Sequence, residues 1–153
     1  MKLLDFLQRE RIVPDLGSRQ KDGVLLELSE VLVATDVIKN SREAVQVLQE
    51  REKLGSTGIG EGIAIPHGKL KDLDQLVLSF GRSSQGVDFE SMDGKPVHLF
   101  FLLVAPENCA GIHLRALAKI ARLLKNSAIR KKLGSVVSRE EIYSIIREED
   151  EDF

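Results

Sequence analysis

The sequence predicts a single α/β domain in which a central mixed β-sheet is flanked by helices on both faces. Two kinds of apolar pattern alternate along the chain, one with the spacing of amphipathic helices and one typical of buried strands. A length of 153 residues fits one domain that buries a core without disulfides or a metal. Hydrophobic residues make up 42% of the chain and charged residues 30%, the balance of an ordinary globular protein.

Two helices are expected in the first third of the chain, at residues 19–34 and 41–53. The first carries apolar residues at helical spacing: Val24, Leu25, Leu28, Val31 and Leu32. Ser18 precedes this helix and is expected to cap its N-terminus. The second helix begins at Ser41 without a capping box, and Gly55 ends it, because glycine readily adopts the backbone conformation that follows a last helical turn.

Two strands and two further helices follow. Residues 76–82 and 97–104 are expected to be strands, and the second is nearly all apolar, which is typical of a central strand covered on both faces. A long amphipathic helix is expected at about 110–126 and a final helix at about 139–147. The final helix has a capping-box pattern that starts at Ser138.

The chain ends in an acidic segment, and we expect the globular domain to span residues 1–148. Residues 149–153 read Glu-Asp-Glu-Asp-Phe. A run of like charges at a terminus usually stays solvated, because its members repel one another. We therefore expect a frayed acidic tail.

Composition and charge exclude several classes of protein. The 22 basic and 24 acidic residues give a formal net charge of -2, whereas nucleic-acid-binding proteins concentrate positive charge. Cys109 is the only cysteine, which excludes an internal disulfide framework and a multi-cysteine zinc site. No run approaches the roughly 20 apolar residues that cross a bilayer, and charges interrupt the N-terminus too early for a signal peptide. We expect a cytoplasmic protein with no nucleic-acid partner and no direct membrane insertion.

Residues 55–69 form a glycine-rich segment, GSTGIGEGIAIPHGK, which could serve only to turn the chain. It is not a dinucleotide-binding fingerprint, because the third glycine, Gly62, comes one position early. It is not a Walker loop either, because Lys69 is followed by Leu70 rather than by serine or threonine. What remains is a loop rich in backbone N–H groups, and such groups can form an anion-binding concavity.

His67 follows this loop, between Pro66 and Gly68. Proline pushes Ile65 toward an extended conformation, and Gly68 allows another group to approach the backbone closely. An imidazole presented there is a good nucleophile toward phosphorus, since its ordinary pKa of about 6.5 leaves it mostly neutral at cytoplasmic pH. Composition alone, however, favours a histidine that merely fills a turn.

The run REKLGSTGIGEGIAIPHGKL, residues 51–70, resembles the active-site segment of enzyme IIA domains of the fructose/mannitol class in the bacterial phosphoenolpyruvate-dependent sugar phosphotransferase system. The resemblance extends through GIHLRALAKIARLL, residues 111–124, and is strongest to the nitrogen-regulatory members. It implies that His67 accepts phosphate, as a tele-phosphohistidine intermediate, from the histidine of the carrier HPr or its nitrogen-branch paralogue. Residue chemistry alone does not decide which ring nitrogen carries the phosphate.

The resemblance also implies two further catalytic residues, Arg51 and His113. Arg51 lies at the C-terminal end of an apolar helix stripe, where its cation can reach a phosphate or only favour the helix dipole. His113 heads the apolar line of the long helix and so faces inward. A role in orienting His67 or its phosphate and a purely structural role both remain open for His113.

Ser56, Thr57 and Gly58 are candidate phosphate-binding residues, through hydroxyl or amide hydrogen bonds, unless they only shape the turn. The apolar residues available for a partner's surface are Ile59, Ile63 and Ile65, although some of them must belong to the core. His98 is interpreted as a histidine on one face of the sheet. No cofactor is expected, and no metal site either, because the spacing of the histidines does not form a ligand set.

Two functions fit such a site, and in both the protein is a phosphotransferase that exchanges phosphate between histidines of two proteins. In the first, the protein is a regulatory IIA protein whose phosphorylation changes its affinity for a target protein. In the second, it is a sugar-transport component that passes phosphate to a sugar-specific enzyme IIB. The single-domain chain favours the first. A binding module with an inactive site is disfavoured, because His67, Arg51 and His113 are all present.

Overall fold

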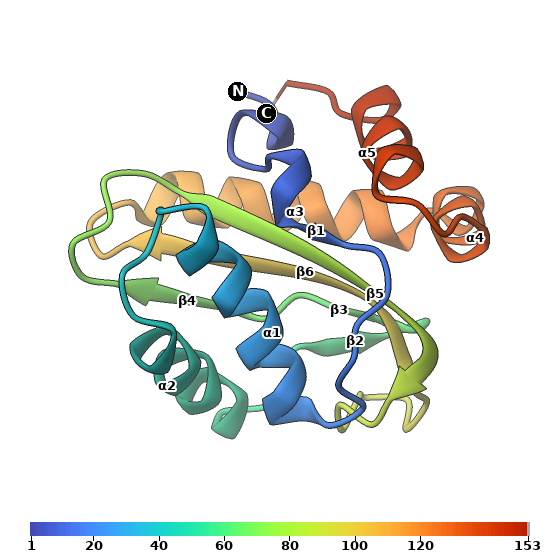
Figure 1. The fold of residues 1–153 in the computed structure, drawn as a ribbon, viewed down its shortest axis with the longest axis horizontal. Coiled ribbons are helices and arrows are strands. Elements are labelled where there is room, and N and C mark those ends of the chain that lie inside the picture. Colours follow the sequence, from blue (N-terminus) through green and yellow to red (C-terminus); the bar gives the residue numbers. More distant parts are fainter. Residues whose placement is uncertain (153) are drawn as a thin grey trace.

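The computed structural model describes residues 1–152, and Figure 1 shows the fold. Six strands form one mixed sheet with the order β1-β5-β6-β3-β2, and β4 also pairs with β6. The strands are β1 (Ile12–Val13), β2 (Gly58–Gly60), β3 (Ile63–Ala64), β4 (His67–Leu70), β5 (Val77–Val87) and β6 (Val97–Pro106). The long strands β5 and β6 are antiparallel, and so are β2 and β3. β1 runs parallel to β5, and β3 and β4 run parallel to β6. The predicted central mixed sheet is confirmed.

Helices cover both faces of this sheet, as predicted (Figure 1). On one face lie α1 (Lys21–Ala34) and α2 (Ser41–Lys53); on the other lie α3 (Ala110–Lys125), α4 (Ser127–Ser135) and α5 (Arg139–Glu148). Two short 3-10 helices, η1 (Leu3–Asp5) and η2 (Arg9–Arg11), precede β1. The sheet therefore separates two hydrophobic cores, one under each helical layer.

The central strand β6 contributes to both cores. Leu99, Phe101, Leu103 and Ala105 pack on the side of α3, α4 and α5, whereas Phe100, Leu102 and Val104 pack on the side of α1 and α2. Successive side chains of a strand point to opposite faces, so a strand covered on both sides needs apolar residues at every position. This is the physical reason for the apolar run in the sequence.

The segment that carries His67 is an interrupted strand. β3 and β4 lie end to end along β6 in one register, with Ile63 opposite Leu99 and His67 opposite Leu103. The ladder breaks at Pro66, which has no N–H to donate, although its carbonyl oxygen still accepts from the N–H of Leu103 at 2.9 Å. His67 is thus the first residue after a break in the strand pairing along β6.

The structure shows which residues cap the first two helices. Ser18 does not cap α1, because its hydroxyl bonds locally to the backbone of Gln20, which is the N-cap residue. The helix α2 begins at Ser41 as predicted, but its cap is Asn40, whose side-chain oxygen accepts from two N–H groups of the first turn. The prediction at Ser18 is wrong because a serine can satisfy its hydroxyl locally instead of at the helix end.

The C-terminal helices follow the predicted order with one addition. The predicted cap at Ser138 is confirmed, since its Oγ accepts from the N–H of Glu141 at 3.1 Å and donates to the Glu141 carboxylate at 2.9 Å. The helix α4 was not expected from the sequence. It begins directly after Asn126, which ends α3 and caps α4 with its side chain.

The prediction of a frayed acidic tail is wrong at Asp150, which is 6% exposed. Its two carboxylate oxygens accept from the N–H groups of Leu3 and Leu4, each at 2.9 Å. These are the donors that the start of η1 leaves without partners, and they attract a carboxylate. The chain ends accordingly lie side by side in Figure 1. Phe153, the last residue of the predicted tail, lies outside the described residues.

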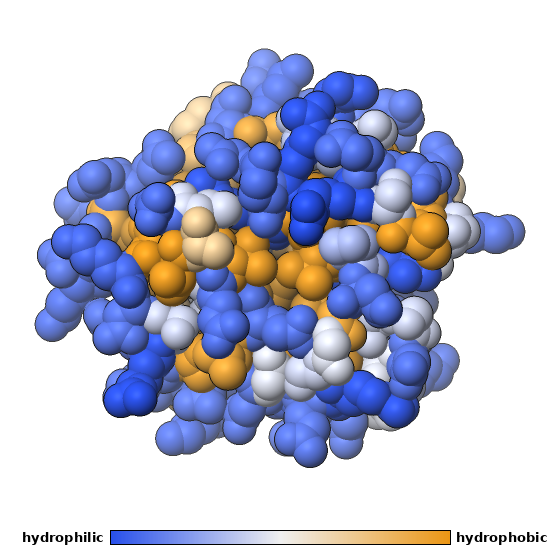
Figure 2. Space-filling model, viewed as in Figure 1, coloured by the Kyte–Doolittle hydropathy of each residue, from blue (hydrophilic) through white to orange (hydrophobic). Residues whose placement is uncertain are grey.

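The outer surface is mainly polar over α1 and α2. Figure 2, drawn from that side, shows hydrophilic side chains over most of the face and a band of apolar side chains across the middle of the view. Across residues 1–152, no helix combines the length and the apolar character needed to span a bilayer.

Candidate active site

His67 opens β4, and its ring faces the α3 side of the sheet. It pairs in parallel with Leu103, whose side chain lies in the core on that side. The Nδ1 atom of His67 lies 2.8 Å from the carbonyl oxygen of Ile65. Because a carbonyl oxygen only accepts hydrogen bonds, Nδ1 carries the proton and Nε2 keeps the lone pair. The site therefore contains an imidazole with one nitrogen fixed and the other available to react.

The environment of His67 keeps this imidazole neutral. Its pKa lies below the ordinary value of 6.5, chiefly because burial disfavours the charged form, and the nearby cation of Arg51 lowers it further. The hydrogen bond to Ile65 and the carboxylate of Glu52 act in the opposite direction, raising the pKa. A neutral ring near pH 7 is what a nitrogen nucleophile requires.

His113 comes from the first turn of α3 and meets His67 edge to face. The ring centroids are 5.6 Å apart and the ring planes make an angle of 85°. His113 is 7% exposed, and its buried Nε2 has no hydrogen-bond partner among the described residues. Burial lowers its pKa, and the charges of His67 and Lys69 add to this effect. The unpartnered Nε2 is an exception to the rule that buried polar atoms are hydrogen-bonded, and it belongs to a ring in contact with His67.

Arg51 lies in the last turn of α2, close enough to His67 for its charge to lower the pKa of that histidine. Its Nη1 donates a hydrogen bond of 2.9 Å to the carbonyl oxygen of Gly55. A guanidinium has five N–H donors, so this bond leaves others available to an anion. The structure thus brings the three residues Arg51, His67 and His113 together from α2, β4 and α3.

Both hydroxyl groups of the three candidate phosphate-binding residues, and the N–H groups of Thr57 and Gly58, are engaged within the protein. Thr57 donates its backbone N–H to both carboxylate oxygens of Glu52, at 3.1 and 3.2 Å, and its hydroxyl donates to the same carboxylate. The hydroxyl of Ser56 donates to the carbonyl oxygen of Phe89 at 2.7 Å and accepts from the N–H of Gly58 at 3.0 Å. In this structure these groups shape the loop instead of facing an anion. The sequence did not reveal this because Phe89 and Glu52 belong to other elements.

The apolar surface around the site differs from the expected one. Ile63 and Ile65 are 0% and 5% exposed, because they belong to the core of the sheet, and only Ile59 remains half-buried. Of the three isoleucines, Ile63 and Ile65 are therefore the ones that belong to the core. Two leucines that the sequence analysis missed are exposed beside site residues, Leu54 (84%) after α2 and Leu114 (68%) next to the α3 histidine. The position of Leu114 off the apolar line of its helix was the available signal.

Other polar candidates lie outside this cluster. His98 is on β6, where its Nδ1 lies 2.8 Å from the carbonyl oxygen of Ser83, and its interpretation as a sheet-face histidine is confirmed. The exposed carboxylate of Glu61 pairs with Arg130 at 3.6 Å. Within residues 1–152, no three His, Cys, Asp or Glu side chains gather in a way that could hold a metal ion.

Comparisons with known proteins match most of the chain. The model of the family described as "Phosphoenolpyruvate-dependent sugar phosphotransferase system, EIIA 2" matches residues 5–149. A nitrogen regulatory protein of Bradyrhizobium diazoefficiens is 45% identical over 146 residues, which cover 95% of each chain. The fructose-specific EIIABC component of Bacillus subtilis is 38% identical over 150 residues, which are 98% of this chain but 24% of that protein. The crystal structure of the nitrogen regulatory protein IIA-Ntr from Neisseria meningitidis has a TM-score of 0.87 at 37% identity, covering 93% of this chain and 97% of that chain.

Proposed function

Because the chain belongs to the EIIA 2 family of the phosphoenolpyruvate-dependent sugar phosphotransferase system, we propose that it is a phosphoryl carrier that accepts phosphate on His67 and acts as a regulatory IIA protein. The observation that carries the assignment of His67 is the hydrogen bond between its Nδ1 and the carbonyl oxygen of Ile65. That bond leaves the lone pair on Nε2, so we assign Nε2, the tele nitrogen, as the phosphorylated atom.

The reaction is the transfer of a phosphoryl group between imidazole nitrogens of two proteins. The Nε2 lone pair of His67 attacks the phosphorus of a phosphohistidine on the donor, the nitrogen–phosphorus bond of the donor breaks, and its electron pair returns to the donor imidazole. Charge spreads over the three phosphoryl oxygens in the transition state, so catalysis depends on positioning and on charge stabilisation.

Two side chains are assigned the role of stabilising that charge. Arg51 is assigned as the cation that faces the phosphoryl oxygens, which its electrostatic effect on His67 supports. His113 is assigned a hydrogen bond from its unpartnered Nε2 to one phosphoryl oxygen, which its edge-to-face contact with His67 supports. Ser56, Thr57 and Gly58 are assigned to loop shape, because both hydroxyl groups and the N–H groups of Thr57 and Gly58 are engaged within the protein.

The donor that we propose is HPr or its nitrogen-branch paralogue, acting in the cytoplasm. Leu54 and Leu114 are the exposed apolar residues that adjoin the elements carrying Arg51 and His113. We assign them to the surface that contacts the donor, because exposed apolar side chains around a site favour association with another protein.

A phosphorylation experiment tests the carrier assignment. The protein is incubated with phosphoenolpyruvate, enzyme I and either HPr or the nitrogen-branch carrier, and an acid-labile, base-stable adduct is sought by mass spectrometry. We expect the adduct on the wild type and on the control His98→Ala, and none on His67→Ala. Full stoichiometry on His67→Ala would disprove the assignment of His67.

The second candidate function is phosphate transfer to a sugar-specific enzyme IIB, which the identity of 38% with a fructose-specific component supports. The regulatory role is supported by the higher identity with a nitrogen regulatory protein over 95% of both chains. Mixing the phosphorylated protein with membranes and candidate sugars separates the two. Stable label is expected of a regulator, whereas rapid loss of label coupled to formation of a sugar phosphate would establish the transport role.

A further inference from the structure

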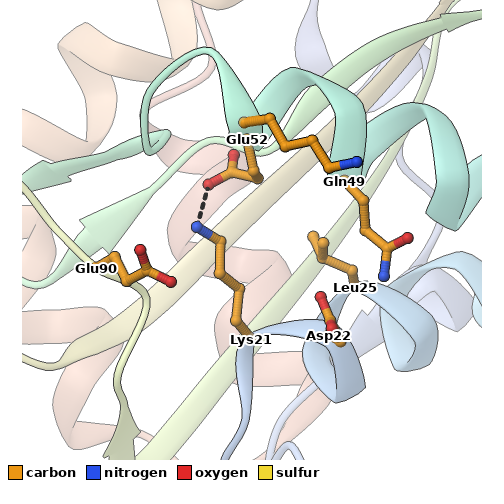
Figure 3. A pocket seen from close by; sticks show the side chains of 7 residues that line it. Lys21, Asp22, Leu25, Gln49, Glu52 and Glu90 are labelled. Atoms are coloured by element: carbon orange, nitrogen blue, oxygen red, sulfur yellow. Dashed lines mark ion pairs between the residues drawn. The ribbon is translucent and has the colours of Figure 1, made fainter.

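A partly buried ion pair joins the start of α1 to the end of α2. The Nζ atom of Lys21 lies 2.9 Å from a carboxylate oxygen of Glu52 (Figure 3), and the side chains are 18% and 5% exposed. The pair lines a cavity of about 390 Å³, whose other charged residues are Asp22, Lys53 and Glu90. Removing two charges from water costs free energy, which their attraction offsets only when further hydrogen bonds satisfy them. The other hydrogen-bond partners of Glu52 therefore decide whether the ion pair stabilises the structure around it.

Those partners belong to the loop that leads toward His67. The Glu52 carboxylate accepts the backbone N–H of Thr57 with both oxygens and accepts its hydroxyl as well. Thr57 is 3% exposed, so in this structure its donors depend on an acceptor within the protein. Arg51, the neighbouring residue of the helix, holds the carbonyl oxygen of Gly55 at the other end of the same bend. Two consecutive residues of α2 thus fix the loop at two points.

The hydrogen bonds continue from Thr57 to the imidazole. The carbonyl oxygen of Thr57 accepts the N–H of Ile65 at 3.1 Å, and the carbonyl oxygen of Ile65 accepts the Nδ1–H of His67 at 2.8 Å. A continuous series therefore runs from the ammonium group of Lys21, through one carboxylate and two backbone residues, to the ring of His67. Each of the three residues between Lys21 and His67 uses both a donor and an acceptor, or two acceptor oxygens, so a shift of one disturbs the hydrogen bonds of its neighbours.

We propose that Glu52 is a positioning residue that, held by Lys21, fixes the ring orientation and the tautomer of His67. Without the carboxylate, two buried donors of Thr57 lose their acceptor and the loop must move to satisfy them. Ile65 then moves with the loop, and Nδ1 of His67 loses its fixed acceptor. The fraction of rings with the lone pair on Nε2 and with Nε2 directed at an incoming phosphorus falls. The rate consequence rests on the proposed function, whereas the tautomer consequence does not.

The test compares Glu52→Ala with the matched control Glu50→Ala, which removes an exposed carboxylate from the same helix. The first readout is the nitrogen spectrum of the His67 ring in the protein labelled with ¹⁵N, which reports the Nδ1–H and Nε2–H tautomers without any donor. The second readout is phosphoryl transfer from phosphorylated HPr, measured as the rate at saturating donor and as the donor concentration for half-saturation.

In Glu52→Ala we expect a new Nε2–H tautomer and a fall of about 10- to 100-fold in the rate at saturating donor. The half-saturating concentration is expected to stay within about twofold of the wild type, since the docking surface is untouched. Glu50→Ala should match the wild type in both readouts. A wild-type tautomer in Glu52→Ala overturns the positioning role, whatever the rate.

A second pair of variants applies if Glu52→Ala does not fold. Lys21→Met leaves the carboxylate without its cation, and Lys21→Arg restores a cation at the same place. We expect the tautomer change in Lys21→Met and its reversal in Lys21→Arg; equal spectra for the two variants overturn the inference. If the wild type takes up no phosphate, the proposed function fails while the ring spectrum still decides the role of Glu52. If the wild type is phosphorylated on His67 and Glu52→Ala keeps its tautomer, only the positioning role fails.

Discussion

The two histidines of the site are chemically distinct although they are in contact. His67 has its Nδ1 committed to Ile65, whereas His113 has a buried Nε2 with no partner among the described residues. Burial lowers the pKa of each below 6.5, so both rings are neutral near pH 7. One ring can then act as the nucleophile, and the other can act as a hydrogen-bonding neighbour that adds no positive charge.

The charge of Arg51 gives the first prediction, on pH dependence. Since this cation lowers the pKa of His67, Arg51→Met should raise that pKa toward 6.5, as measured by titrating the ring signals by NMR. The unfolded chain binds a proton at a higher pH than the folded protein does, so the neutral His67 stabilises the fold fully above about pH 6.5 and this contribution is lost as the pH falls toward the folded pKa. In Arg51→Met the loss of unfolding free energy on lowering the pH should be smaller.

The control for this prediction is Arg42→Met, which removes a cation from the first turn of the same helix. It should leave the titration of His67 unchanged. In the phosphoryl-transfer assay, Arg51→Met should slow transfer by about 100- to 1000-fold, the range for removal of one charge-stabilising donor. A transfer rate equal to that of the wild type would leave Arg51 as a partner of the helix dipole only.

At the scale of the elements, the position of β4 depends on how closely α2 approaches it. Gly68 is paired with Val104, whose side chain lies on the α2 side of the sheet. A Cβ atom at Gly68 would lie 2.6 Å from Cγ1 of Val47 in α2. The sequence analysis correctly expected a close approach to this glycine, but the group that approaches is a helix side chain.

This contact predicts the effect of adding a side chain at Gly68. Gly68→Ala should destabilise the protein by about 1–3 kcal/mol, because the added methyl group forces α2 away from β4. Val47→Ala should relieve the clash, so the double variant should be about 1 kcal/mol more stable than the sum of the single effects. Urea unfolding gives the free energy of unfolding of each of these variants.

The control is Gly134→Ala, since nothing lies within 4 Å of a Cβ atom built at that helical position. It should be neutral or stabilising by up to about 1 kcal/mol. Additive effects of Gly68→Ala and Val47→Ala would show that the two residues are not packed as described.

The start of α2 gives a prediction of its own. Asn40→Ala removes the side-chain oxygen that accepts from Arg42 N–H at 2.9 Å, so it should cost about 1 kcal/mol of unfolding free energy. Ser41→Ala, at the position where the sequence placed the helix start, should change stability by less than about 0.5 kcal/mol. A larger loss in Ser41→Ala than in Asn40→Ala would reverse the assignment of the cap.

For the molecule as a whole, hydrogen bonds and an ion pair hold the two chain ends together. Asp150 closes the start of η1, and the amino group of Met1 pairs with Asp152 at 3.4 Å. The second pair is largely exposed and contributes little to stability. We propose that the domain extends at least to Asp150, beyond the boundary at residue 148 that the charge pattern suggested.

Asp150→Ala should therefore destabilise the whole protein, by about 1.5–3 kcal/mol, because two backbone donors lose a charged acceptor. The neighbouring Glu151→Ala removes an exposed carboxylate from the same acidic run and should change stability by less than about 0.5 kcal/mol. Thermal or urea unfolding compares the two. Equal stability of the two variants would show that the acidic tail is solvated and does not stabilise the fold.

Local patterns in the sequence were sufficient for most of the fold. The apolar run of β6 and the apolar stripes of α2 and α3 were correctly interpreted, because the period of a strand or a helix is set within a few turns of chain. The short strands β2, β3 and β4 were not expected as strands, since the glycines and the proline around them suggest a loop. They become strands only because β6 offers a backbone edge for β3 and β4, and β3 in turn for β2.

The sequence by itself determined the alternation of helices and strands, the two-sided burial of the sheet, and His67 as the residue to examine. Tertiary structure alone decided which distant residues meet: His113 with His67, Asp150 with the start of η1, and Glu52 with Lys21. The physical reason is the range of the interactions. Periodicity reflects neighbours along the chain, whereas a buried carboxylate or ring nitrogen is satisfied by whichever group the folded backbone brings within about 3 Å.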